Sequence, residues 1–235
     1  MPVDLAPTPP ILDLVTERTR RALLAVAETL TLSKGSVMFR TGDSSDGLYE
    51  LVSGKVKLSR LPGEAPDHPA NRHESLLRVV SAGQIFGELA VFDGGPRNAT
   101  AVAVTKAVVR RYAQADIQRM VREHPDLAVA CLAHITRRLR FALERTTDIH
   151  IRDGSARLGK AILLLGSRFG QRDGSRLVVR HDLTQAELGA LTGLSRETVS
   201  KLLADLAGRG LLEIGAGWIV VTDEDALRRQ IGPYT

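Results

Sequence analysis

Residues 33–112 are divided into short β-type runs separated by glycines, and this pattern constrains the fold more than any other. The runs are rich in β-branched and large apolar residues, and alternation is clearest over residues 55–59. Many short strands at close spacing are typical of a barrel or jelly roll. We count the run over residues 83–92 among these strands. The turns fall at glycines, namely Gly35, Gly42, Gly54, Gly83 and Gly87.

Helical patterns flank this β-type region. Residues 11–32 carry apolar residues at mostly helical spacing, which predicts short helices. Residues 61–74 hold three prolines and have no periodicity, which favours an extended loop in a hairpin. From Asp126 to about Ile149 the pattern predicts one long helix that begins near Pro125.

Apolar and small residues recur along this long helix at alternating steps of three and four, which is the spacing of a coiled coil. We therefore expect the helix to form a homodimer seam, although a helix packed on its own domain would give the same pattern. The seam residues are Ala128, Leu132, Ile135, Leu139, Ala142, Thr146 and Ile149.

The last third of the chain predicts a winged helix-turn-helix. A helix over residues 155–169 precedes a turn-rich segment and a strand over 177–180. Two helices over 184–191 and 195–208 then lead into a strand-turn-strand over 211–221. Helix, tight turn, helix and β-wing in this order are typical of DNA-binding domains.

The predicted fold class is therefore α+β. An N-terminal β jelly roll with flanking helices is expected over residues 1–125, a dimerisation helix with a hinge over 126–152, and a winged helix-turn-helix over 153–235.

Composition excludes several classes of protein. A lone Cys131 cannot form an intrachain disulfide or supply the thiolates of an iron–sulfur or cysteine-rich zinc site. No apolar run approaches the roughly 20 residues that a membrane-spanning helix needs, and the N-terminus does not resemble a secretion signal. We therefore expect a cytoplasmic protein that does not contact a membrane. The net charge of +5 is weak support for a polyanionic partner, because residues 151–235 hold 12 basic and 10 acidic side chains.

The first motif that carries chemistry runs from Phe86 to Thr100, FGELAVFDGGPRNAT. A glycine such as Gly87 lets the backbone approach a ligand, Glu88 can accept hydrogen bonds from sugar hydroxyls, and Arg97 can pair with a phosphate. Backbone N–H groups of a turn or short helix around Ala99 would complete an anion site. The alternative is that Glu88 and Arg97 form an ion pair on the surface of the barrel.

This motif resembles the phosphate-binding cassette of the cyclic-nucleotide-binding domain, which has the form F-G-E-L followed by P-R-x-A. The resemblance implies that Glu88 bonds the ribose hydroxyl and Arg97 the cyclic phosphate. It also implies that cyclic AMP is the allosteric ligand. The implied binding residues are Gly87, Glu88, Leu89, Arg97, Asn98, Ala99 and Arg138.

The second motif, TQAELGALTGLSRETVSK, covers residues 184–201. Gly193 stands where the chain turns between two helices, and Ser195 can cap the second helix. Arginine, glutamate and lysine can contact base edges in the major groove, and Thr184 and Gln185 can bond phosphate oxygens. The alternative is a helical hairpin with a charged, solvated face. The candidate DNA-binding residues are Thr184, Gln185, Ser195, Arg196, Glu197, Thr198 and Lys201.

The second motif strongly resembles the DNA-binding domain of the cyclic-AMP receptor protein and fumarate-nitrate regulator superfamily. The resemblance implies a homodimeric transcriptional regulator that reads an inverted repeat similar to TGTGA-N6-TCACA. It also implies a contact with RNA polymerase, for which residues 169–176 are a positional candidate. An enzyme is disfavoured, because no segment after the barrel offers a nucleophile–base set, a metal-ligand cluster or a phosphate loop.

The sequence departs from the cyclic-AMP receptor protein on the long helix. That protein has a Thr-Ser pair shortly after Arg-Arg-Leu, whereas this chain has Ala142 and Leu143, which cannot hydrogen-bond a base. Another ligand, or regulation without a ligand, therefore stays open. No metal and no haem are expected, although Cys131, His134 and His73 are conceivable haem ligands.

Overall fold

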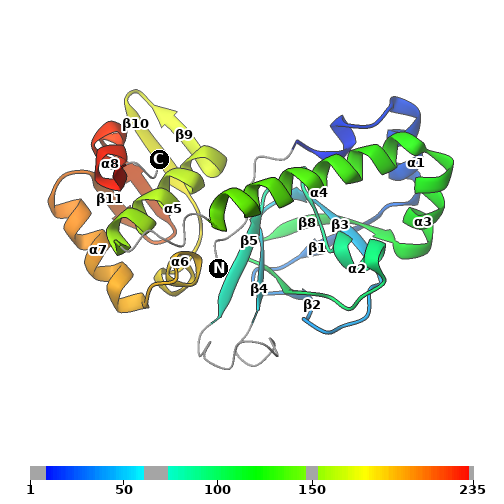
Figure 1. Ribbon diagram of the computed structural model, residues 1–235, viewed down its shortest axis with the longest axis horizontal. Helices are drawn as coiled ribbons and strands as arrows, with labels where there is room; N and C mark the ends of the chain where they lie inside the picture. The colour runs from blue at the N-terminus through cyan, green and yellow to red at the C-terminus, as the bar shows by residue number, and fades with distance from the viewer. Residues whose placement is uncertain (1–8, 61–73, 147–152, 233–235) are drawn as a thin grey trace.

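The computed structural model describes residues 9–60, 74–146 and 153–232, with side chains given for all of these except 141–146. A barrel and a winged domain lie at the two ends of an elongated molecule, and one long helix runs along the barrel toward the winged domain (Figure 1). Within the described ranges no helix is both long and apolar enough to cross a membrane.

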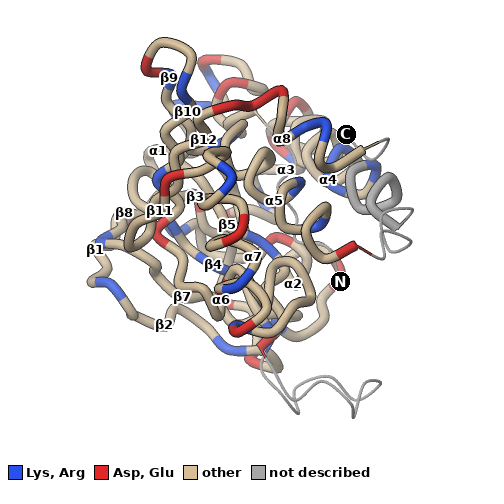
Figure 2. The backbone as a smooth tube through the Cα atoms, turned by 90° about the vertical axis from the view of Figure 1, so that its left-hand side faces the viewer, with Lys and Arg blue, Asp and Glu red and all other residues tan. Residues whose placement is uncertain are grey.

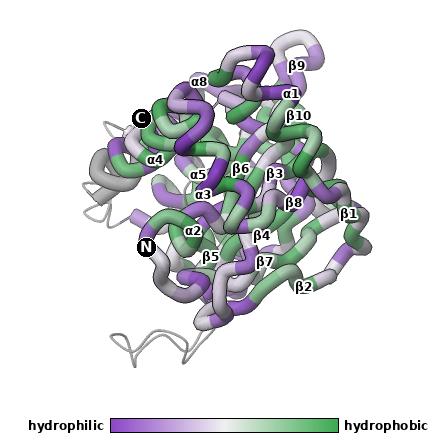
Figure 3. Tube along the Cα trace, turned by 90° about the vertical axis from the view of Figure 1, so that its right-hand side faces the viewer, coloured by the Kyte–Doolittle hydropathy of each residue, from purple (hydrophilic) through white to green (hydrophobic). Residues whose placement is uncertain are grey.

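The β-type region forms a barrel of two four-stranded antiparallel sheets, which confirms the predicted jelly-roll class. One sheet has the order β1-β8-β3-β6 and the other β2-β7-β4-β5. Hydrophobic residues run through these strands (Figure 3), and Phe39, Tyr49 and Phe86 meet in the core between the sheets. The strands are β1 (Glu28–Leu32), β2 (Val37–Phe39), β3 (Gly47–Ser53), β4 (Val56–Arg60), β5 (Ser75–Val80), β6 (Ile85–Phe86), β7 (Thr100–Ala103) and β8 (Ala107–Ala113).

Two local predictions in this region are wrong. Residues 11–32 give a 3-10 turn (Ile11–Asp13) and helix α1 (Glu17–Val26), but the last five residues form β1, because pairing with β8 overrides their helical spacing. The run 83–92 holds only the two-residue strand β6 and then turns into helix α2 (Glu88–Asp93). Gly87 makes this turn with a φ of 76°. The short helix therefore lies at Glu88 rather than around Ala99.

Helices α3 (Gln114–Glu123) and α4 (Pro125–Thr146) follow the barrel. The sequence pattern predicts α4 but does not predict α3. Thr16 lies just before α1 and Thr19 lies on it. The Thr16 backbone N–H and the Thr19 hydroxyl each donate a hydrogen bond to the Asp126 carboxylate at 2.8 Å. These bonds outweigh the effect of burial and hold the pKa of Asp126 at about 2. They anchor the start of α4 to the N-terminal helix.

The winged helix-turn-helix is confirmed. Its core is a four-stranded sheet of order β11-β12-β10-β9, packed against α5, α7 and α8. The predicted turn-rich segment forms a hairpin, and the C-terminal helix α8 was not predicted. The elements are α5 (Gly154–Phe169), β9 (Gly170–Asp173), β10 (Arg176–Arg180), α6 (Gln185–Thr192), α7 (Arg196–Gly208), β11 (Leu212–Gly215), β12 (Trp218–Val221) and α8 (Glu224–Ile231).

The winged domain packs directly on the barrel. Leu76, Val79 and Val104 of the barrel belong to the same hydrophobic cluster as the core of the winged domain. Lys57 on β4 pairs with Glu187 on α6 at 2.7 Å, and both side chains are largely buried. Although burial opposes both charges, their hydrogen bond raises the pKa of Lys57 and lowers that of Glu187.

Candidate functional site

Glu88 begins α2 and points into the barrel, where its side chain is only 2% exposed. Arg138 reaches it from α4, and the two form a close ion pair. A charge removed from water in this way is stable only when it is paired. The predicted ribose contact and the predicted α4 contact therefore lie together in the structure.

Arg97 follows α2 and is also turned into the barrel, with 1% exposure of its side chain. Its Nη2 donates to the Asp46 carboxylate at 2.5 Å and to the Gly47 carbonyl at 2.6 Å, and its Nη1 donates to the Gly87 carbonyl at 2.7 Å. The guanidinium also lies 4.2 Å from the centre of the Phe39 ring, a favourable cation–π distance. The two terminal nitrogens of Arg97 are thus held by the fold.

Glycine is required beside this arginine. A Cβ atom at Gly87 would lie 2.5 Å from Arg97 Nη1, and one at Gly47 would lie 2.1 Å from the Tyr112 carbonyl oxygen. Among the described residues, Arg97 Nε has no hydrogen-bond partner, although it is buried. A ligand phosphate could engage this Nε–H group.

The surface ion pair between Glu88 and Arg97, offered above as an alternative, is excluded. Both side chains are buried, and each has a different partner, Arg138 for Glu88 and Asp46 for Arg97. Burial raises the pKa of Asp46, but hydrogen bonds from Tyr49, Arg97 and Arg111 outweigh it, so the pKa is lowered. Asp46 therefore stays ionised and holds Arg97. The sequence analysis missed Asp46, because only the fold brings it to Arg97.

A small cavity of about 50 Å³ lies where these elements meet. Pockets that bind ligands of ordinary size are roughly 300–1,000 Å³, so this cavity must open before a nucleotide can enter. Arg97 does not line this cavity. The buried Arg78 does line it, although the sequence pattern does not point to this residue. The lining residues are Leu58, Leu77, Arg78, Gly87, Glu88, Leu89, Asn98, Ala99 and Arg138.

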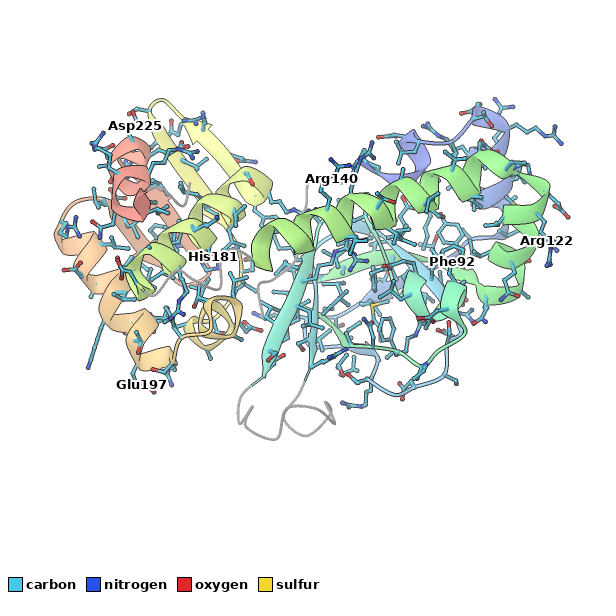
Figure 4. The ribbon with its side chains drawn as sticks, viewed as in Figure 1. Phe92, Arg122, Arg140, His181, Glu197 and Asp225 are labelled. Carbon is cyan, nitrogen blue, oxygen red and sulfur yellow. The ribbon has the colours of Figure 1, made fainter. Side chains whose placement is uncertain are left out.

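The second helix of the helix-turn-helix, α7, is presented to solvent. Gly193 takes a left-handed φ of 68° between α6 and α7, and Ser195 caps α7 by accepting from Thr198 N, as predicted. Arg196, Glu197 and Lys201 are exposed in its first turns. Figure 4 shows Glu197 at the lower tip of α7, which is the start of that helix.

The start of α6 faces the barrel instead. Thr184 and Gln185 line a cleft of about 610 Å³ between the winged domain and the barrel, together with Lys34 and Lys106. The Thr184 hydroxyl is engaged with the Glu187 carboxylate at 3.0 Å in a capping box. The two predicted phosphate contacts thus lie at the cleft toward the barrel, where Thr184 is exposed and Gln185 is half-buried.

Helix α4 carries an exposed apolar stripe. Val129, Leu132 and Leu139 are 66%, 65% and 56% exposed, and Ile135 is half-buried beside them. These large apolar side chains have no cover within the described chain. Of the other predicted seam residues, Ala128 is half-buried, and Ala142, Thr146 and Ile149 fall outside the described side chains.

Two of the three candidate haem ligands, Cys131 and His134, lie among the described residues, both on α4. Burial, with the nearby Glu88 carboxylate, raises the pKa of Cys131 to about 12, so the thiol stays protonated. Cys131 and His134 are both buried in or beside α4, and His73 lies outside the described residues. No group of three or more His, Cys, Asp or Glu side chains in the described ranges could hold a metal ion.

Comparison with known proteins places both sites in one family. Residues 29–124 match the cyclic nucleotide-binding domain, and residues 156–230 match the Crp-like helix-turn-helix domain. The chain is 34% identical over 209 residues to a protein of Mycobacterium tuberculosis named CRP-like cAMP-activated global transcriptional regulator, covering 89% of this chain and 90% of the relative. The chain belongs to the CRP/FNR family of transcriptional regulators.

Other comparisons agree. The Cyclic AMP receptor protein of Thermus thermophilus is 34% identical over 200 residues, covering 84% of this chain and 85% of the relative. The crystal structure of a CRP/FNR family transcriptional regulator from Thermus thermophilus superposes with a TM-score of 0.71 at 26% identity, covering 88% of this chain and 100% of that one. As a CRP/FNR regulator, the protein is a DNA-binding transcription factor and not an enzyme.

The order of the two matched domains along this chain agrees with the CRP/FNR assignment. A nucleotide-binding barrel, a long helix and a winged domain follow one another in this chain as one connected unit. The barrel cavity and α7 are therefore the two candidate sites of this regulator, and α4 contributes Arg138 to the first of them.

Proposed function

We propose that this regulator is a homodimer that binds an inverted-repeat operator when a cyclic nucleotide occupies the barrel. We divide the chain for this purpose into residues 1–125, 126–152 and 153–235. The observation that carries the DNA-binding half is α7, whose Arg196, Glu197 and Lys201 are exposed on the first turns of a capped helix. Such side chains can contact base edges when the helix enters the major groove.

Cyclic AMP is the first ligand to test, because the relatives at 34% identity are named for cyclic AMP. In the barrel, Glu88 would accept from the ribose hydroxyl and the Nε–H of Arg97 would donate to the phosphate, with Asn98 and Ala99 beside them. The Arg138–Glu88 pair would have to separate. A ligand that moves Arg138 also moves α4, which links the barrel to the winged domain.

A second copy of the chain would cover the apolar stripe of α4. Leu132 and Leu139 are seven residues apart, the heptad repeat of a coiled coil, and Val129 extends the same exposed face. Two copies related by a two-fold axis would place their α7 helices toward two half-sites, about 34 Å apart along DNA. Leu132→Glu together with Leu139→Glu should convert the dimer to a monomer in sedimentation, and an unchanged dimer would contradict this seam.

Transcription activation would also require a contact with RNA polymerase. The β9–β10 hairpin is our candidate, because Gln171, Arg172 and Asp173 are exposed on the winged domain away from α7. Substituting these three with alanine should lower activated transcription in vitro while operator binding stays unchanged. A parallel loss of both would place the effect on DNA binding instead.

The main test of the proposed function is fluorescence anisotropy with a labelled TGTGA-N6-TCACA duplex and a scrambled duplex, each with and without cyclic AMP. We expect the unmodified chain to bind the TGTGA-N6-TCACA duplex more tightly than the scrambled duplex, and more tightly still with cyclic AMP. The variant with both leucines of the dimer seam replaced should lose this preference. Equal binding of the two duplexes would refute sequence-specific recognition.

The alternative is the same DNA-binding regulator acting without cyclic AMP or with another small ligand. The observation in its favour is the small cavity, which is closed by the Arg138–Glu88 pair. Specific operator binding that is identical with and without cyclic AMP would favour this alternative.

A further inference from the structure

The cleft between the winged domain and the barrel is much larger than the cavity inside the barrel. Its volume is about 610 Å³, against about 50 Å³ for the cavity beside Glu88. Small-molecule sites usually have about 300–1,000 Å³ and often lie where two domains meet. The cleft is therefore already large enough for a small ligand.

Both domains build the walls of this cleft. The barrel contributes Lys34 from the loop between β1 and β2, and residues 104–106 from the loop between β7 and β8. The winged domain contributes residues 181–185, which lead into α6, and residues 214–217 at the turn of the wing. A ligand in the cleft would thus contact side chains of both domains.

His181 brings a buried hydrogen-bond donor to the lining of the cleft. The residue is 2% exposed, and its Nδ1 accepts a hydrogen bond from the Leu183 backbone N–H at 3.0 Å. Burial lowers the pKa of His181 to about 4, so the ring is neutral and carries its proton on Nε2. Among the described residues, this Nε2 is buried and has no hydrogen-bond partner. A ligand acceptor that reaches it would satisfy an unpaired donor, which is unfavourable in a protein interior.

The charged side chains of the cleft favour an anion. Lys34 and Lys106 are exposed, and neither forms an ion pair within the described part of the chain. Asp182 also lines the cleft, but its carboxylate is already paired with Lys55. The two lysine ammonium groups are therefore available to an oxyanion, with which they form strong, charge-assisted hydrogen bonds.

The cleft also offers apolar surface. Leu188 of α6, Leu203 of α7 and Ile219 of β12 line it and belong to the core of the winged domain. Ile214 on β11 lines it as well and is 37% exposed. Apolar surface together with cationic groups suits a ligand that joins an anionic head to an apolar body.

We propose that this cleft binds an amphipathic organic anion, with a carboxylate or phosphate head on an apolar body, and that this ligand weakens operator binding. The binding step does not depend on the proposed function. The effect on DNA does rest on it, because Thr184 and Gln185 line the same cleft and are predicted contacts to DNA phosphates. A ligand held there would compete with the DNA backbone for these two residues.

Calorimetric titration of the unmodified full chain tests the chemistry of the site. The probes are octanoate, octyl phosphate, 1-octanol and octylammonium, which share the apolar chain and differ in the head. We expect the two anions to bind at least about tenfold more tightly than the alcohol and the cation, because only they can pair with the lysines. Octanol or octylammonium binding as tightly as the anions would overturn the proposal.

Nuclear magnetic resonance of the chain with 15N-labelled histidine tests the place of binding. The Nε2–H signal of His181 is identified by its absence in His181→Gln. Octanoate should shift this signal, because the carboxylate or the apolar chain then lies against the ring. A signal that stays unchanged at saturating octanoate would overturn the assignment to this cleft.

Removing the two cations tests their role without touching the core. Lys34→Gln together with Lys106→Gln should weaken octanoate binding about tenfold or more, with circular dichroism confirming the fold. The matched control is Arg18→Gln together with Arg122→Gln, which removes two exposed cations from α1 and α3 outside the cleft lining (Figure 4). The control should bind octanoate like the unmodified chain. An affinity unchanged by the lysine substitutions would overturn the proposal.

The effect on DNA is measured by anisotropy with the TGTGA-N6-TCACA duplex and cyclic AMP. Octanoate should weaken operator binding by the unmodified chain and by the arginine control, and much less by the lysine variant. Octanoate that binds in the cleft and leaves operator affinity unchanged would overturn the inhibitory role. Absence of specific operator binding without octanoate would refute the proposed function, whereas octanoate binding to the cleft would still stand.

Discussion

The two functional sites of this regulator differ in how their charges are held. In the barrel, Arg97 and Glu88 are buried and bonded to other protein groups, and the cavity beside them is about 50 Å³. On α7, Arg196 and Lys201 stand in solvent on a capped helix. Along the backbone of the winged domain, basic and acidic residues alternate over several elements (Figure 2). On the proposed function, the barrel site would therefore have to rearrange to bind a ligand, whereas α7 would need only the right orientation toward DNA.

The sharpest way to break this contrast is to truncate the buried arginine. Arg97→Ala removes the partner of Asp46 and of two backbone carbonyls, so the free energy of unfolding should fall by about 3–5 kcal/mol. Urea unfolding followed by circular dichroism measures it. The matched control, Arg196→Ala, should change this free energy by no more than about 0.5 kcal/mol. Equal stability of the two variants would show that Arg97 is not held as described.

The exposed arginine should matter for DNA instead. Arg196→Ala should weaken binding to the operator by about 1–3 kcal/mol and relax the preference at one base pair, because a base contact is lost. Binding-site selection from a randomised duplex measures the preference. A selected motif identical to that of the unmodified chain would remove Arg196 from the recognition set.

Acid tests the burial of His181 in the winged domain. Burial lowers the pKa of His181 to about 4, below its usual value near 6.5. The unfolded chain therefore binds a proton at this residue before the folded chain does, so stability contributed by neutral His181 is present above about pH 6.5 and is lost as the pH falls toward 4. At pH 5 the loss should be about 2 kcal/mol. Figure 4 shows His181 within the winged domain rather than at its outer edge.

Unfolding of the unmodified chain and of His181→Gln between pH 7 and pH 4 measures this effect. Carboxylates with a lowered pKa, such as Asp46 and Glu187, also contribute less to the stability of the fold in acid, and this loss is the same in both proteins. The unmodified chain should therefore show the steeper decline. Parallel curves for the two proteins would contradict a neutral, buried His181.

The smallest expected effect concerns the ion pair between the two domains. A double-mutant cycle of Lys57→Met and Glu187→Gln should give a coupling free energy of about 1 kcal/mol, because both side chains are largely buried. The exposed pair Arg21–Glu17 on α1 is the control and should give about 0.3 kcal/mol. A Lys57–Glu187 coupling no larger than that of the control would mean that the contact does not hold the domains together.

The sequence predicted the features that depend on local chemistry. The capped turn at Gly193 and Ser195, the helix from Pro125 and the strand runs of the barrel all follow from residues close in the chain. Strand β1 and helix α2 were misassigned, because pairing with β8 and the turn at Gly87 override the local pattern. Asp46 could not be predicted, because its role depends on a contact with Arg97, which is far away in the sequence.

One measurement tests the central claim of ligand-gated DNA binding most directly. The affinity of the full chain for a cyclic nucleotide is determined by calorimetry with and without a saturating operator duplex. If the nucleotide favours the DNA-binding state, DNA must tighten nucleotide binding by the same factor by which the nucleotide tightens DNA binding, typically about 5- to 150-fold. We predict this reciprocal gain. Nucleotide affinity that is the same with and without operator would contradict the account.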